Sequence, residues 1–100
     1  MSEADWGFAP SPFQPQEALQ RLRRALRELG LQEREGLWER RGVTLVRLVL
    51  QSEAIEASRV KKPSRNSPEW VLRTLRSSAD VRDFTGDLKK QLAHWSDDHD

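Results

Sequence analysis

The stretch Leu37-Trp38-Glu39-Arg40-Arg41-Gly42-Val43-Thr44-Leu45-Val46-Arg47-Leu48-Val49-Leu50 decides the fold class. β-Branched residues cluster in its second half, and Gly42 can adopt the backbone conformation of a tight turn. The stretch therefore predicts two strands, residues 37–41 and 43–50, that pair around Gly42. The second strand is apolar on both faces except at Thr44 and Arg47, which is typical of a central strand.

The residues after this hairpin predict a third strand. Residues 51–53 can turn the chain, and residues 54–62 form a more polar run that ends in Lys61 and Lys62. Lysines of this kind suit a protected sheet edge. A helix over residues 53–58 is the competing interpretation, because Ala and Glu favour helices.

The residues before the hairpin predict an amphipathic helix. Pro15 suits a first helical turn, and Gly30 suits the end of the helix. Between them, apolar residues recur at spacings of three and four: Leu19, Leu22, Leu26 and Leu29.

Two further helices are predicted after the third strand. Ser67-Pro68-Glu69 is a helix start that combines a hydroxyl cap, an early proline and an acid, and Trp70, Val71, Leu72 and Leu75 would supply the apolar face. Ser77 or Ser78 would cap a last helix, with Asp80 as an acid of the capping-box type. The apolar face of that helix would consist of Val81, Phe84, Leu88, Leu92 and Trp95.

These elements predict a two-layer α+β domain in the order α-β-β-β-α-α, with the helices on one face of a three-stranded antiparallel meander. A chain of 100 residues with 36% hydrophobic residues fits one such domain. We expect residues 1–14 to be a flexible tail, residues 15–96 the domain and residues 97–100 an acidic tail. Phe13 is expected to dock on the domain, whereas the positions of Trp6 and Phe8 stay open.

Several classes of site are excluded by composition. The chain has no cysteine, which rules out disulfides, iron–sulfur clusters and thiolate zinc sites. The polar, acidic N-terminus does not resemble a secretory leader, and the longest apolar stretch is far shorter than a membrane helix. We expect a cytoplasmic protein without a membrane span.

Catalytic chemistry has little support in the sequence. The histidines are His94 and His99, both near the end of the chain, and no nucleophile elbow or phosphate-binding glycine loop is present. The acidic run 97–100 is interpreted as a solvated tail rather than a metal site. The expectation is a non-enzymatic protein with no cofactor and no metal.

The leading functional hypothesis comes from the predicted sheet. If all helices cover one face, apolar side chains of the central strand remain on the other face and need a cover. The cover could be a second copy, a partner protein, the aromatic N-terminal tail or a different packing of the helices. The sequence thus predicts a small protein-binding module, acting as a homodimer or in a complex, with Trp38, Val43 and Leu45 as contact residues.

The alternative hypothesis is nucleic-acid binding through residues 59–76. This segment combines cations with the predicted helix start, whose free N–H groups would bind anions. Trp70 would add a stacking surface. The contributing residues would be Arg59, Lys61, Lys62, Arg65, Trp70, Arg73 and Arg76. The competing interpretation is a solvated strand end with a basic connector.

The charge distribution along the chain has two interpretations. Residues 18–76 hold 14 Lys and Arg residues against 7 Glu residues, whereas both ends of the chain are acidic. A basic middle could hold an anionic partner, or the acidic ends could neutralise it within the fold.

The predicted order of elements over residues 15–77 resembles that of the double-stranded-RNA-binding domain, which is α-β-β-β-α. That family carries a Lys-Lys-x-Ala-Lys run at the start of its last helix. Here Lys61 and Lys62 precede Pro63, and the predicted helix opens with Ser67-Pro68-Glu69-Trp70. The resemblance is therefore one of topology, and it does not extend to the motif that binds RNA.

Overall fold

A computed structural model describes residues 13–64 and 66–98. Their elements are α1 (Pro15–Glu28), β1 (Gln32–Arg34), β2 (Leu37–Arg40), β3 (Val43–Leu50), β4 (Ile55–Val60), β5 (Trp70–Leu75) and α2 (Ser78–Asp98). Most of the predicted tails, residues 1–12 and 99–100, lies outside the described residues.

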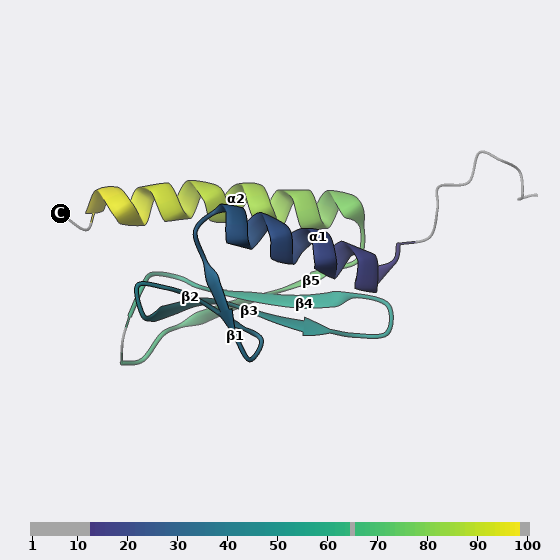
Figure 1. The fold of residues 1–100 in the computed structure, drawn as a ribbon, viewed down its shortest axis with the longest axis horizontal. Coiled ribbons are helices and arrows are strands. Elements are labelled where there is room, and N and C mark those ends of the chain that lie inside the picture. Colours follow the sequence, from purple (N-terminus) through teal and green to yellow (C-terminus); the bar gives the residue numbers. More distant parts are fainter. Residues whose placement is uncertain (1–12, 65, 99–100) are drawn as a thin grey trace, which may run out of the picture.

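The five strands form one antiparallel sheet in which strand order follows chain order. Both helices lie on the same side of this sheet, α2 beside α1 (Figure 1). The predicted α+β class and the antiparallel meander are confirmed. The predicted number of elements is wrong for the described part of the chain, because it has five strands rather than three and two helices rather than three.

Two tight turns of the same type start the meander. Glu35 and Gly36 join β1 to β2 with φ angles of 54° and 82°, and Arg41 and Gly42 join β2 to β3 with φ angles of 55° and 79°. Two-residue hairpin loops with both φ angles positive follow the right-handed twist of the strands. Strand β1 was not predicted, although the Glu35-Gly36 pair repeats the signal that identified Gly42.

Residues 70–75 form a strand, so the helix predicted after Ser67 is wrong. All six residues of β5 pair with β4, from Trp70 opposite Val60 to Leu75 opposite Ile55. A six-residue helix would bury little and leave the edge of β4 unpaired, whereas β-branched Val71 and Thr74 fit a pleated surface. This strand also replaces the last helix that the resemblance to the double-stranded-RNA-binding domain implied.

Strand β4 settles the ambiguity over residues 53–58. Ile55 and Ala57 are buried and Glu56 and Ser58 are half-buried, which is the alternation of a strand with one core face. The prediction of a strand is confirmed here, and the competing helix is excluded.

Both helices begin or end with specific contacts. At the end of α1, Gly30 has φ 92° and the Leu31 N–H donates to the Leu26 carbonyl at 3.0 Å. At the start of α2, the Asp80 N–H donates to the Ser77 hydroxyl at 3.0 Å, and the Asp80 carboxylate accepts the Arg76 N–H at 2.9 Å. The predicted cap at Ser77 with Asp80 is therefore confirmed.

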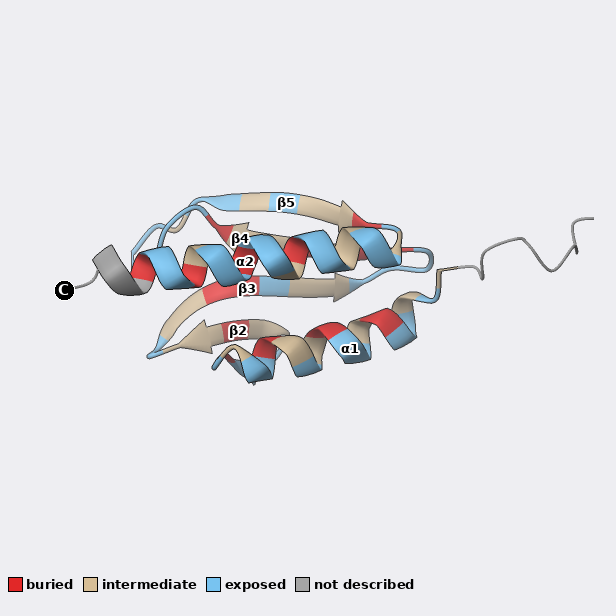
Figure 2. Ribbon diagram, turned by 90° about the horizontal axis from the view of Figure 1, so that it is seen from above, coloured by how far each residue is buried: buried red, intermediate tan, exposed pale blue. Residues whose placement is uncertain are grey.

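Most of the core fills the space between the helices and the sheet. Buried residues recur between exposed ones along both helices (Figure 2). The largest fully buried side chains are Trp38, Phe84, Leu22, Leu26, Leu45, Ile55, Leu75, Leu88, Val46 and Val60. Neither described helix is long and apolar enough to cross a membrane.

Candidate interaction surface

One face of the sheet carries the helices, and the strand register identifies its residues. Residues directly opposite each other on paired strands point to the same face. Leu48, Ala57 and Arg73 form such a row across β3, β4 and β5. Arg73 lies 3.4 Å from the Asp87 carboxylate and 4.0 Å from that of Asp83, both on α2. This row therefore belongs to the helix face.

The opposite face of the sheet, called the open face below, is covered by neither described helix (Figure 1). One row of residues crosses all five strands on this face: Arg34, Leu37, Arg47, Ser58 and Leu72. A second row joins Val49, Glu56 and Thr74, and alternation along β5 adds Trp70.

Apolar side chains on the open face range from buried to largely accessible, since Val60, directly opposite Trp70, is 0% exposed. Leu72 is 60% exposed and Trp70 is 37% exposed, while Leu37 and Val49 are half-buried. Arg47 is exposed between them and forms no ion pair with a described residue. The open face is thus a mixed surface with apolar side chains around a central guanidinium group.

The three contact residues predicted from the sequence do not lie on this open face. Trp38 is 0% exposed and Leu45 is 2% exposed, both in the core, and Val43 is half-buried against it. The reason is an irregularity in pairing: Trp38 lies opposite Val46 but Glu39 lies opposite Thr44, so Leu45 is an extra residue on β3. Such a bulge breaks the alternation, and consecutive Leu45 and Val46 are both buried. The apolar run of β3 therefore reflects a bulge rather than an apolar open face.

The basic segment is not gathered into one patch. Lys61 and Lys62 are exposed in the β4–β5 connection, whereas Arg76 follows the other end of β5, about 20 Å away at the rise of an extended strand. Arg73 faces α2 and is paired there, while Trp70 is on the open face. These two side chains therefore lie on opposite faces of the sheet.

The remaining parts of the predicted anion site also differ from expectation. Arg59 is half-buried and its Nη1 donates to the Val60 carbonyl at 3.4 Å. Residues 67–69 form no helix start, and the Ser67 N–H donates to the Ser64 hydroxyl at 3.3 Å. Arg65 lies outside the described residues.

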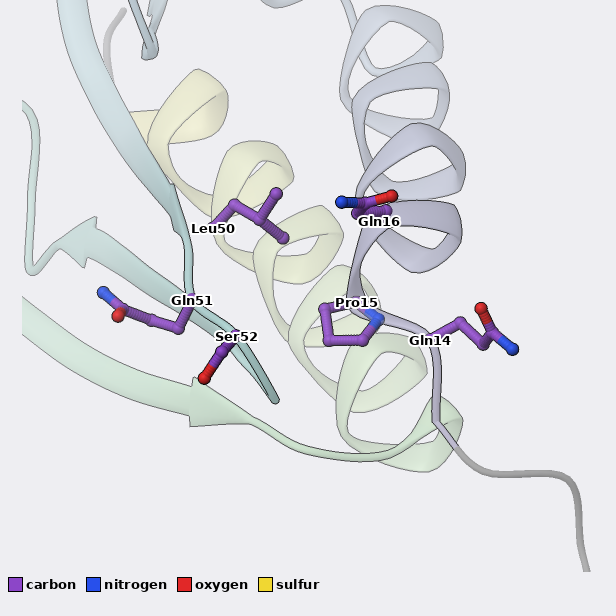
Figure 3. A pocket seen from close by; sticks show the side chains of 6 residues that line it. All are labelled: Gln14, Pro15, Gln16, Leu50, Gln51 and Ser52. Atoms are coloured by element: carbon purple, nitrogen blue, oxygen red, sulfur yellow. The ribbon is translucent and has the colours of Figure 1, made fainter.

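A surface pocket lies between the start of α1 and the β3–β4 turn (Figure 3). Its lining consists of Gln14, Pro15, Gln16, Leu50, Gln51 and Ser52. These side chains supply amides and one hydroxyl for hydrogen bonding, but none is a general base at neutral pH. Over the described ranges, no group of three or more His, Asp or Glu side chains is arranged to hold a metal ion.

Comparisons of this chain with protein-family models, with curated proteins and with solved structures found no match. The functional argument therefore rests on the geometry of the open face and of the sheet edges.

Proposed function

We propose that this chain is a small, non-enzymatic binding module whose open face binds a partner protein. The observation that carries the proposal is the placement of both described helices on one side of a five-stranded sheet. An antiparallel sheet with one solvated face normally presents polar residues there. Here Leu72 is 60% exposed and Trp70 is 37% exposed on β5, and half-buried Leu37 and Val49 lie on the same face of β2 and β3.

The chemistry of the open face indicates the kind of partner. Tryptophan and arginine are enriched among the residues that dominate binding energies at interfaces. Arg47 lies in the middle strand of the sheet, next to Leu37 on β2 and Ser58 on β4. A matching protein surface would place a carboxylate opposite Arg47 and apolar side chains around it.

The test uses two variants on the open face and one matched control. Arg47→Glu reverses the central charge, and Val49→Asp adds a charge on the same strand and face. Lys89→Glu makes the same kind of reversal on an exposed position of α2, away from the open face. Circular dichroism and thermal unfolding would verify that all three variants remain folded.

Proteins and nucleic acids bound to the wild-type chain would be recovered from its native cells and identified, and the recovered protein would then be purified and titrated. We expect both open-face variants to bind that protein at least tenfold more weakly and the Lys89 variant to bind it normally. Equal affinity for all variants would overturn the proposal. Recovery of nucleic acid alone, with binding that is lost when Lys61 and Lys62 become Ala, would replace it with the nucleic-acid alternative.

A further inference from the structure

The two edges of the sheet are unequal. Strand β1 has three residues, all exposed and polar, and natural proteins use such short edges to prevent strand pairing. Strand β5 has six residues, four of them apolar, and it pairs with β4 alone. Its one charged side chain, Arg73, is directed to α2 and pairs there with Asp87. Strand β5 therefore lacks the short length and the outward charged side chains that usually prevent an edge strand from pairing with another chain.

The hydrogen-bond pattern shows which backbone groups β5 leaves free. The Lys61 N–H donates to the Glu69 carbonyl at 2.9 Å, which continues the β4–β5 register by one pair. In an antiparallel ladder, hydrogen-bonded and non-hydrogen-bonded pairs alternate. Val71, Arg73 and Leu75 are then the residues whose N–H and C=O groups point to β4.

The intervening residues, Trp70, Leu72 and Thr74, direct their N–H and C=O groups to the open edge. Hydrogen bonds on the other side of the sheet lead independently to the same assignment of free backbone groups on β5. The Leu48 N–H donates to the carbonyl of Gly36, the residue directly before β2, at 3.3 Å, and the Gln51 N–H donates to the Ala54 carbonyl at 2.8 Å. Alternation from these two bonds through β3 and β4 again assigns Leu72 to the free edge.

We propose that β5 is the homodimerisation edge of this protein, pairing antiparallel with β5 of a second copy about a two-fold axis at Leu72. In this register Leu72 lies opposite itself, and Trp70 of each copy lies opposite Thr74 of the other. All three outward residues of each strand find partners, which makes the edge self-complementary as an isologous contact requires. The two sheets join into one sheet of ten strands.

Charges and side chains fit this register. Arg73 lies opposite Val71 of the second copy rather than opposite another cation, and it keeps its contact with Asp87. Glu69 of each copy lies opposite Leu75 of the other, and Arg76, the next residue, points to the other face, so no like charges lie opposite each other at either end of the strand pair. The two Leu72 side chains, each 60% exposed in the single chain, contact each other across the axis.

This inference goes beyond the proposed function, because it uses the backbone edge of β5, although the side chains of Trp70, Leu72 and Thr74 also belong to the open face. The open face would bind a partner through side chains, whereas the edge would bind a second copy mainly through the backbone. Arg47→Glu changes a side chain of the open face on β3, away from the edge, whereas Thr74→Pro removes a backbone N–H of the edge, so these two variants separate the surfaces.

The first arm of the test blocks the free backbone donor of one outward residue. Thr74→Pro removes an N–H that points away from β4, so the ladder to β4 keeps its bonds, and the ring obstructs an incoming strand. Thr74→Val is the matched control, since it changes the same side chain and keeps the N–H. Sedimentation equilibrium should show a wild-type dimer in the micromolar range, a Thr74→Val dimer, and at least tenfold weaker association for Thr74→Pro.

The second arm tests the register and does not depend on a proline. Leu72→Lys and Leu72→Glu each place like charges opposite each other on the axis, so each variant alone should be monomeric. An equal mixture should recover the dimer as a Lys–Glu heterodimer. The face variant Arg47→Glu should leave the dimer intact.

A wild-type chain that stays monomeric across the micromolar range would overturn the inference, as would a folded Thr74→Pro variant that dimerises normally. A Lys–Glu mixture that stays monomeric would overturn the register. Loss of the dimer in Arg47→Glu would overturn the edge as its location and assign self-association to the open face.

Discussion

Trp38 and Trp70 show how two residues of the same type occupy opposite environments in one sheet. Trp38 lies on β2 beneath the helices and is 0% exposed, whereas Trp70 starts the edge strand β5 and is 37% exposed. The sequence places both next to apolar and charged neighbours, so neither composition nor spacing distinguishes them. The bulge opposite Trp38 depends on the pairing of two strands, which cannot be derived from either strand alone.

The difference in burial between the two tryptophans predicts a difference in stability. Trp38→Ala should lower the free energy of unfolding by about 3–5 kcal/mol, because it removes the largest fully buried side chain and leaves a cavity. Trp70→Ala should lower it by about 1 kcal/mol, since much of that ring is already in water. Urea unfolding of both variants at one protein concentration measures the difference, and equal losses would contradict the assignment of Trp38 to the core.

A second prediction concerns Arg41, whose φ of 55° is in the left-handed region. A side chain with a Cβ disfavours this region, and asparagine tolerates it better than most residues. Arg41→Asn should therefore raise the free energy of unfolding by about 0.5–1 kcal/mol. Thermal and urea unfolding would check this result. The neighbouring change Gly42→Ala, at φ 79°, should have the opposite sign.

At the scale of single elements, local patterns identified α1, β2, β3, β4 and α2 but misassigned β5. The series Trp70, Val71, Leu72 and Leu75 fits one face of a helix, and the same six residues also fit a half-exposed strand. The helix-start pattern Ser67-Pro68-Glu69 favours the helix over the strand. Pairing with the otherwise open edge of β4 outweighs that local preference, and such pairing between distant segments is invisible to a window of a few residues.

Helix α2 contains a glycine that lowers its stability, and this effect can be tested. Gly86 lies within this 21-residue helix, and a Cβ at this position would meet no atom within 4 Å. Gly86→Ala should raise the free energy of unfolding by about 0.5–1 kcal/mol, because alanine favours the helix without steric conflict. Urea unfolding would show the increase. An unchanged or lower stability would mean that the surroundings of Gly86 are occupied.

At the scale of the whole molecule, the two-layer arrangement and its uncovered sheet face follow from the pattern of elements. The residues on that face do not follow, because they depend on register: Leu37, Arg47 and Leu72 fall in one row only when four strands are aligned. The basic segment shows the same dependence. Its cations are close in sequence, but the strand at residues 70–75 separates Lys61 and Lys62 from Arg76 by its whole length.

The order of strands in the sheet also has a consequence for folding kinetics. Since each strand pairs with its neighbours in the chain, the whole sheet can form from hairpins whose loop-closure entropy is small. The contact between α1 and α2 joins opposite ends of the chain and therefore closes the largest loop. A sheet that has already formed shortens this loop and lowers the entropy cost of closing it. We therefore expect the hairpins of β2, β3 and β4 to be structured in the transition state for folding. The contact between the two helices is expected to form after that transition state.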